Sequence, residues 1–307
     1  MSAVVVAMLT YRRPRDLAVA VPAFLAEARL HGGSVLIVDN DPDASARDYV
    51  TGLGEPDVRY VHEPRPGIAA GRNRALDEMS DELLVFVDDD ERPVDGWLKA
   101  LLDCRTATGA AVVVGAVVSE FEVPPPDWVV AGGFFDRRRL PTGTSVDVAA
   151  TNNLLLDMAR VGPTGTRFDE AFGLSGGSDT LFSRTLVRHG LAMVWCDEAV
   201  VIDMVPATRM TREWVLARAR RSGNSASRAE LELATSTGTQ LGVRGRYVAR
   251  GLVRIAGGSV RIVLGALRRQ DVTQLTGRRN VQRGRGMISG ALGHVVYEYK
   301  RPSSTAA

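Results

Sequence analysis

The stretch LLVFVDDDE, residues 83–91, is an apolar run that passes directly into four acidic residues. Two earlier apolar runs, at residues 4–9 and 35–40, are separated by a segment with the apolar spacing of a helix. Parallel strands that are buried on both faces of a sheet have this continuous apolar character. The pattern therefore predicts an α/β fold that opens with a β-α-β unit and uses residues 83–91 as its fourth strand.

The alternation of strand and helix patterns continues to about residue 235. We expect further strands at residues 58–63, 110–123 and 146–157, two short strands within 191–205, helices at 68–79 and 179–190, and a loop-rich insertion at 124–144. Near residue 240 the sequence becomes rich in glycine, arginine and branched apolar residues. We therefore expect an α/β domain over residues 1–235 and a basic, mainly helical extension over residues 236–307.

Charge is divided unevenly between these two parts. The chain has a formal net charge of +2, but residues 244–301 contain 13 lysines and arginines against two acidic residues, which leaves −9 for the rest. Five arginines share one face of a predicted helix: Arg246, Arg250, Arg254, Arg261 and Arg268. This amphipathic stretch predicts contact with an anionic membrane surface. The alternative is a helix packed on the first domain, and its glycines weaken an isolated helix.

Composition limits the class of protein and its compartment. With 45% hydrophobic and 24% charged residues, the chain has the composition of a globular protein. Cys104 and Cys196 lie far apart and indicate neither a disulfide framework nor a zinc site. No apolar run is long enough to predict a membrane-spanning helix or a secretory leader. We expect a cytoplasmic protein whose membrane contact is peripheral, on the inner face of the cell membrane.

The acidic cluster at residues 88–90 is the clearest chemical signal. Three adjacent carboxylates repel one another, and a divalent cation such as Mg²⁺ or Mn²⁺, shared with a substrate diphosphate, would neutralise them. Side chains alternate in direction along a strand, so Asp88 and Asp90 are expected to face one site while Asp89 turns away. The alternative is a solvated acidic turn. Ligands of open α/β sheets bind beyond the carboxyl ends of strands, and that position favours the site.

Two other strands deliver polar groups to the same edge. The first strand ends at Thr10, Tyr11 and Arg12, and the second ends at Asp39. These groups suit a nucleotide, with carboxylate and hydroxyl for base edges and arginine for phosphate or base stacking. For Asp39 the alternative is an Asx-turn with the residues that follow. No glycine-rich phosphate-binding motif is present, so metal and arginines would meet the diphosphate charge.

Six segments, in this order and spacing, together resemble the family-2 glycosyltransferases, whose nucleotide-sugar domain has the GT-A fold, a Rossmann-like mixed sheet flanked by helices. The resemblance covers about two thirds of the chain, from residue 4 to 225. Its motifs are VAMLTYRRP, LIVDND, EPRPGIAAGRNRAL, VFVDDDERP, TNNLLLD and FDEAFGLSGGSDTLFSRTLVRHG.

The resemblance implies a role for each matching residue. The donor-nucleotide site would comprise Thr10, Tyr11, Arg12, Pro14, Asp39, Arg65, Gly67, Gly71, Arg72, Asn73, Asp88 and Asp89. Asp90 would coordinate the Mn²⁺ or Mg²⁺ ion, and Asp179 matches the general base of inverting members. Candidates for contact with the donor or acceptor sugar are Trp128, Asn152, Asn153, Gly177 and Ser178. The alternatives are helix capping for Asp179 and buried packing for Trp128.

The implied reaction is an inverting transfer of one sugar from a nucleotide-diphosphate sugar, UDP-linked, to a glycan, lipid-linked or other hydroxyl acceptor. A sugar hydroxyl is a poor nucleophile, so a carboxylate must take its proton. Two departures from the family pattern limit the match. Ser178 stands where many relatives have Glu, and Asp203 stands where some have a metal-binding His, which leaves the third metal ligand open.

Three other functions remain as alternatives. A nucleotidyltransferase would want a glycine-rich, lysine-bearing first loop, and TYRRPRD at residues 10–16 is neither. A nucleic-acid-binding protein driven by the basic tail is disfavoured by the acidic first domain and the lack of an RNA-binding motif. A non-catalytic nucleotide-sugar binder would be unaffected by loss of Asp179.

Overall fold

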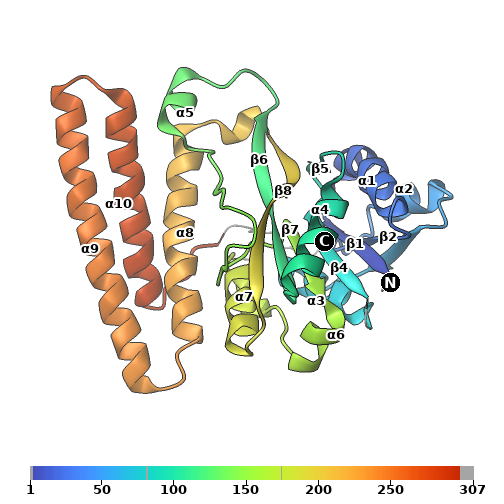
Figure 1. The fold of residues 1–307 in the computed structure, drawn as a ribbon. Coiled ribbons are helices and arrows are strands. Elements are labelled where there is room, and N and C mark those ends of the chain that lie inside the picture. Colours follow the sequence, from blue (N-terminus) through green and yellow to red (C-terminus); the bar gives the residue numbers. More distant parts are fainter. Residues whose placement is uncertain (1–2, 81, 174, 298–307) are drawn as a thin grey trace, which may run out of the picture. The chain divides into compact units, whose positions relative to one another are not determined.

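The protein, a computed structural model, is described for residues 3–80, 82–173 and 175–297 (Figure 1). Within these ranges eight strands form one sheet. The strands are β1 (Val4–Thr10), β2 (Ser34–Asp39), β3 (Val58–His62), β4 (Leu83–Asp88), β5 (Glu91–Pro93), β6 (Val112–Phe121), β7 (Asn153–Asp157) and β8 (Met193–Val205).

The helices alternate with the strands along the chain or follow the last of them. They are α1 (Pro14–Arg29), α2 (Arg47–Gly52), α3 (Ile68–Asp77), α4 (Trp97–Thr108), α5 (Asp127–Gly132), α6 (Met158–Val161), α7 (Ser178–Arg188), α8 (Arg212–Glu232), α9 (Thr237–Leu267) and α10 (Asp271–Ala291). Short 3₁₀ turns are η1 (Gly162–Thr164), η2 (Glu170–Phe172) and η3 (Ala207–Arg209). None of the helices in the described part of the chain is both long and apolar enough to cross a bilayer.

The sheet is mixed, with strand order β3-β2-β1-β4-β7-β6-β8-β5. The first four strands run parallel, β7 lies antiparallel between β4 and β6, and β5 is antiparallel to β8. Thr10 is in register with Asp39, and Leu9 with Asp88. The predicted mixed α/β sheet is therefore confirmed, and the carboxyl ends of β1, β2 and β4 meet at one edge.

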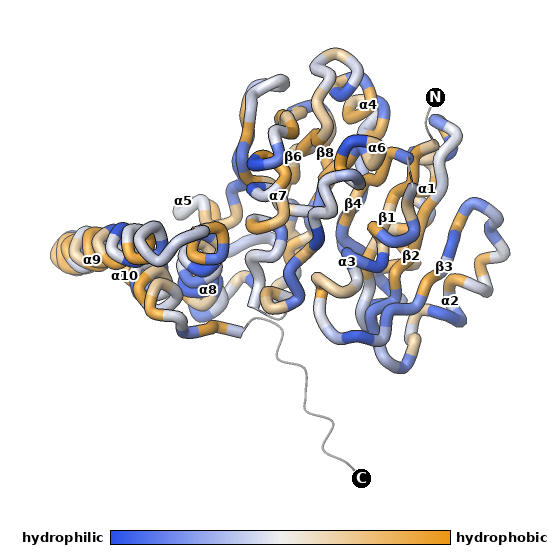
Figure 2. The backbone as a smooth tube through the Cα atoms, turned by 90° about the horizontal axis from the view of Figure 1, so that it is seen from below, coloured by the Kyte–Doolittle hydropathy of each residue, from blue (hydrophilic) through white to orange (hydrophobic). Residues whose placement is uncertain are grey.

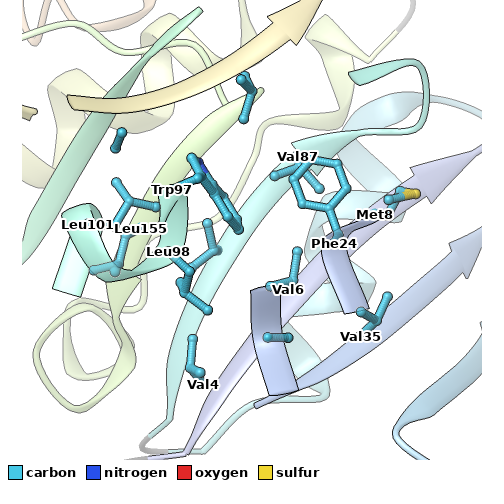
Figure 3. Packing of buried hydrophobic residues seen from close by; sticks show 14 of the residues in the cluster. Val4, Val6, Met8, Phe24, Val35, Val87, Trp97, Leu98, Leu101 and Leu155 are labelled. Atoms are coloured by element: carbon cyan, nitrogen blue, oxygen red, sulfur yellow. The ribbon is translucent and has the colours of Figure 1, made fainter. Parts of the chain in front are cut away.

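The core occupies both faces of the sheet, because successive strand residues point to opposite sides. On one face Val4, Val6 and Met8 pack against α1 and α4 (Figure 3). The rings of Phe24 and Trp97 meet there edge to face, with their centroids 5.1 Å apart. The other face packs against α3 and the later part of α7. The first strands read as uninterrupted apolar runs because both of their faces are covered.

Two strand predictions are wrong in extent. In place of two short strands within 191–205, Met193–Val205 form the single strand β8, because the residues between Cys196 and Val200 bulge out of the pairing with β6 and let the strand continue. The strand expected at 146–157 begins only at Asn153, and the preceding residues are irregular. Helix α4, which provides Trp97 to the core, was absent from the expectations.

Contacts divide the chain into two compact units, and each is described by itself. Unit 1 comprises Met1–Glu122, Asp136–Asp169 and Phe182–Val205, and unit 2 comprises Val123–Phe135, Glu170–Leu181 and Pro206–Ala307. Unit 1 holds the sheet. In unit 2, α10 packs against both α8 and α9, so the expected extension is helical. Because α8 groups with these helices, the units do not coincide with one cut at residue 235, and the division into functional domains stays a prediction.

Candidate active site

The ends of β1 and β4 are joined by a network of carboxylates, a hydroxyl and an arginine in unit 1. Thr10 donates its hydroxyl to Asp89 at 2.8 Å. Arg13 lies 2.9 Å from a carboxylate oxygen of Asp89 and 3.0 Å from one of Asp90. Arg13 therefore spans two of the three adjacent carboxylates. Sequence reasoning passed over it in favour of Arg12, although both belong to the doublet that follows the strand.

Burial changes the protonation of the acids at this edge. Burial, and next the charge of Asp90, raise the pKa of Asp88 to about 6. Burial also raises the pKa of Asp89 to about 7, against the opposing effects of Arg13 and Thr10. A solvated acidic turn would leave these groups near their ordinary values. The triplet is thus a partly buried charged site.

Glu91 extends the acidic site inward. It is 1% exposed, it accepts the backbone N–H of Asp88 at 3.1 Å, and it accepts the side-chain amide of Asn152 at 2.8 Å. Burial and the charge of Asp88 raise the pKa of Glu91 well above its ordinary value. Glu91 is in register with Asp203, which pairs with Arg137. Asp203, at the position where the third metal ligand was left open, therefore pairs with an arginine that lies 66 residues away in the sequence.

Asp39 organises the loop that follows β2. The side chain is fully buried, and it accepts hydrogen bonds from the backbone of Asp41 at 3.0 Å and Ala46 at 2.8 Å and from the hydroxyl of Tyr60 at 3.1 Å. The Asx-turn alternative is therefore present in the structure. Contact of Asp39 with a nucleotide base stays a prediction.

Arg12 is held by the acids of that same loop. Its Nε lies 3.1 Å from Asp41 and its Nη2 lies 2.7 Å from Asp43. The residue has a φ of 56°, in the left-handed region that is uncommon for a side chain with a Cβ. Its guanidinium lies 5.4 Å from the ring centroid of Tyr11. These contacts set the direction of the β1–α1 turn, where Pro14 begins α1.

A second loop is fixed by residues that the sequence interpretation did not select. Asn40 donates to the carbonyl oxygens of residues 63 and 65 at 2.8 and 2.7 Å, and it accepts from the backbone N–H of Gly67 at 3.2 Å. Glu63 accepts the Arg65 guanidinium at 2.8 and 2.9 Å. Arg65 is therefore anchored at the edge beyond β2 and β3. The available signal was the position of Asn40 one residue past a strand end.

The residues expected on α3 divide into two kinds. Gly71 gives α3 close contact with β1, since a Cβ there would lie 2.8 Å from the Leu9 side chain. Asn73 exchanges two 2.9 Å hydrogen bonds with the backbone of Phe168, so its amide fixes a distant segment. Arg72 lies 5.5 Å from the Phe168 ring centroid, and its charge opposes the pKa rise of Asp88. Only Arg72 of these three acts electrostatically on the acidic cluster.

Asn153 lies in the core rather than beside the acids. It accepts from the Trp97 indole at 2.9 Å and donates to the carbonyl oxygens of Ala116 at 2.9 Å and Ala199 at 2.8 Å. The side chain is 1% exposed. These bonds give Asn153 a structural role, tying α4 to the sheet, while its neighbour Asn152 reaches Glu91.

The remaining candidates belong to unit 2. Asp179 stands in the first turn of α7, and its carboxylate accepts the backbone N–H of Thr180 at 2.8 Å. Gly177 has a φ of 102°, which only glycine adopts readily, and Ser178 is buried. Trp128 lies in α5, between the Phe134 ring and the Arg212 guanidinium. Trp128 is thus partly packed, as its alternative reading expected.

Among the residues that the structure describes, no cluster of three or more His, Cys, Asp or Glu side chains could hold a metal ion. Asp88 and Asp90 supply hard carboxylate oxygens at a strand end. Mg²⁺ is commonly bound through one or two carboxylates, with phosphate and water oxygens filling its other positions. The donor set therefore fits a cation shared with a diphosphate, and it does not fit a cation held by the protein alone.

Comparisons with known proteins agree with this geometry. The family model "Glycosyl transferase family 2" matches residues 5–159. The "Succinoglycan biosynthesis protein ExoM" of Rhizobium meliloti (strain 1021) is 34% identical over 231 residues, covering 73% of this chain and 74% of that protein.

Two solved structures are similar in fold. Residues 1–349 of S. aureus TarS in complex with UDP-GlcNAc give a TM-score of 0.50 at 13% identity, over 98% of both chains. GalNAc-T7 with UDP, GalNAc and Mn²⁺ gives a TM-score of 0.52 at 12% identity, over 75% of this chain and 51% of that one. These likenesses identify the fold as the expected GT-A type.

Proposed function

Because the chain belongs to glycosyl transferase family 2 and is a glycosyltransferase that acts on a nucleotide sugar, we propose a specific reaction for it. The protein transfers one sugar from a UDP-linked donor to a hydroxyl acceptor, with inversion of the anomeric configuration. The observation that carries this proposal is the position of Asp88 and Asp90, at the carboxyl end of β4, inside the segment that the family model matches. Ligands of open α/β sheets bind at that edge.

In this proposal the donor nucleotide lies along the edge formed by β1, β2 and β4. Arg12 and the loop of Asp39 contact the base and ribose, and Arg65 and Arg72 lie toward the phosphates. Support comes from the anchoring of these side chains, since Glu63 holds Arg65 and two acids hold Arg12. Pre-positioned groups reduce the ordering cost of binding.

Asp90, with Asp88, would hold a Mn²⁺ or Mg²⁺ ion that, when bound, supplies positive charge to the departing diphosphate. Arg13 forms ion pairs with both Asp89 and Asp90, so it would keep one partner if Asp90 bound the cation. We propose that Arg13 keeps Asp89 ionised while Asp90 turns to the cation. Thr10 supports the same ionised state by donating its hydroxyl to Asp89 at 2.8 Å.

We assign the general base to Asp179. Its carboxylate would take the proton of the acceptor hydroxyl as that oxygen bonds to the anomeric carbon, while the bond from that carbon to the diphosphate oxygen breaks. One displacement from the opposite face inverts the anomeric configuration. The hydrogen bond from the Thr180 backbone N–H to the Asp179 carboxylate at the start of α7 supports an oriented base.

The acceptor is proposed from the relative and from the charge of the C-terminal part. ExoM is named for succinoglycan biosynthesis, so we propose a growing glycan, carried on a lipid, as the acceptor in polysaccharide biosynthesis. Eleven positive charges in excess within residues 244–301 favour work at an anionic membrane surface, on its inner face.

The proposal is tested by calorimetric titration of the full chain with UDP, with and without Mn²⁺. Asp90→Ala should lower UDP affinity in the presence of Mn²⁺ by about tenfold or more, because the shared cation loses a protein ligand. Asp103→Ala is the matched control, since this exposed carboxylate lies on α4 and pairs only with Lys99 among the contacts described.

Transfer is measured separately from binding. Asp179→Asn should keep UDP binding and lose sugar transfer by about a hundredfold or more. Retained transfer would remove the base assignment. If UDP binds and neither the native chain nor any variant transfers sugar, the chain is a nucleotide-sugar binder. If no nucleotide binds under any condition, the donor-site assignment is wrong.

A further inference from the structure

Helices α9 and α10 in unit 2 approach each other closely, because glycines of each helix lie against the backbone and branched side chains of the other. Gly251, Gly258 and Gly265 recur every seven residues on α9, and all three are buried. A Cβ at Gly251 would lie 2.8 Å from the carbonyl oxygen of Gly284, and one at Gly258 would lie 2.7 Å from that of Gly277. The glycines that weaken an isolated helix are therefore what brings these two helices together.

Six large apolar side chains of α9 face away from this contact, whereas Ile255 and Ile262 pack against glycines of α10. Successive residues of a helix are rotated by about 100°, so the six side chains lie on the side opposite to the glycines. We call this set the outer apolar face, and its exposed fractions run from 41% to 77%: Leu252, Val253, Val260, Val263, Leu264 and Leu267. Figure 2 looks nearly down the axis of α9, and much of this helix has the orange colour of hydrophobic residues.

The six exposed side chains distinguish α9 from the helices of a pair that is stable in water. In water, paired helices bury their large apolar side chains and expose polar ones. In lipid, small residues form the helix contact and large apolar residues face the hydrocarbon. A contiguous exposed apolar strip on a protein marks an interaction surface. The outer apolar face of α9 therefore needs an apolar medium or partner.

The arginines beside the outer apolar face indicate what kind of partner it binds. Residues 237–267 contain five arginines and no acidic residue. Arg250, Arg261 and Arg268 lie along one border of the outer apolar face, and all three are exposed. A second copy of the chain would place such a border against its own like charges, which is unfavourable. An anionic lipid surface satisfies both the arginines and the apolar side chains.

We propose that the outer apolar face of α9 lies in the interface of an anionic bilayer, with the helix in the membrane plane and its arginine border at the lipid phosphates. No described helix has the length and apolar character to span a bilayer, which agrees with a surface position. The inference deepens the proposed work at a membrane and depends on that proposal only for the lipid-linked acceptor. The membrane contact is tested without sugar transfer.

The test is flotation of the full chain with vesicles of phosphatidylcholine and phosphatidylglycerol at a 7:3 ratio. The triple variant Leu252→Gln/Val260→Gln/Leu267→Gln should bind these vesicles about tenfold more weakly or worse. The control variant Val19→Gln/Leu30→Gln/Val130→Gln removes three apolar side chains of matching exposure elsewhere in the chain. The control should bind within about twofold of the native chain, since those side chains lie outside the outer apolar face.

A second set of variants tests the contribution of the arginine border to vesicle binding. Arg250→Gln/Arg261→Gln/Arg268→Gln should weaken binding by up to about fivefold for each arginine removed. Native chain should bind pure phosphatidylcholine vesicles far more weakly than the mixed vesicles. Circular dichroism of each variant checks that the helices still form.

Three results would overturn the inference: no binding of the native chain to the mixed vesicles, equal binding by the outer-face variant, or a stable dimer that the outer-face variant alone dissociates. Sedimentation velocity without vesicles measures that dimer. UDP titration of the same samples separates this inference from the proposed function. A chain that binds vesicles and not UDP contradicts only the function, and the converse contradicts only the membrane contact.

Discussion

The edge of the sheet in unit 1 and the α9–α10 pair in unit 2 bury opposite kinds of group. At the sheet edge, polar side chains are buried with hydrogen-bond partners, as Asp39 is, which accepts from two backbone N–H groups and from the Tyr60 hydroxyl. In the helix pair, glycine backbone is buried and apolar side chains are exposed. Burial of polar groups requires partners with fixed geometry, whereas backbone contact requires only the absence of a side chain.

This difference indicates what each region is suited to do. A buried, fully bonded polar network holds side chains in fixed positions, which binding and catalysis need. Close packing at the glycines of α9 leaves the opposite side of this helix, the outer apolar face, available to a partner. We therefore expect substitutions in the two regions to act on different quantities.

The largest expected difference between the two regions is in the rate at which a cysteine thiol reacts. Burial raises the pKa of Cys196 to about 12, so at pH 8 only about one thiol in ten thousand is ionised. We expect Cys196 to react with iodoacetamide on the order of a thousandfold more slowly than a cysteine introduced by Val263→Cys on the outer apolar face. Mass spectrometry of the labelled peptides measures both rates. Equal rates would show that the core of unit 1 opens far more than its packing indicates.

The next contrast compares two neighbouring asparagines in unit 1. Asn153→Ala removes the three buried hydrogen bonds that this amide makes to the Trp97 indole and two backbone carbonyls, and should lower the free energy of unfolding by roughly 3 kcal/mol or more. Asn152→Ala removes one described hydrogen bond, to Glu91, and should cost about 1–2 kcal/mol. Urea unfolding measures both. A neutral Asn153→Ala with impaired sugar transfer would instead place this residue at the substrate.

The smallest contrast compares two neighbouring glycines on α9. Gly258→Ala should loosen the contact with α10 by about 2 kcal/mol, because its Cβ would lie 2.7 Å from a carbonyl oxygen. Gly257→Ala meets nothing within 4 Å and should stabilise the helix by up to about 1 kcal/mol. Hydrogen exchange of the α10 backbone amides reports the difference. The same response to both substitutions would contradict packing through the glycine backbone.

The sequence interpretation succeeded where the signal was local. Continuous apolar runs identified β1, β2 and β4, and the polar residues after them identified the edge where they meet. It selected Thr10 and the three acids, and it also selected Arg12. It missed Arg13 and Asn40, because their partners are distant in the sequence. It also missed Glu63, because an acid two residues before an arginine is not a distinctive pattern. Arg137 is the clearest case, since its partner Asp203 is 66 residues away.

The sequence by itself determined the α/β class, the family, the acidic strand end and the basic C-terminal part, because apolar periodicity, motif order and charge are properties of the chain. Only the tertiary structure decided which polar groups are bonded, that Asn153 lies in the core, and that the glycines of α9 face another helix. Those outcomes depend on which surfaces meet. Helical spacing places residues on a face, but the neighbour that packs there decides whether the face is buried.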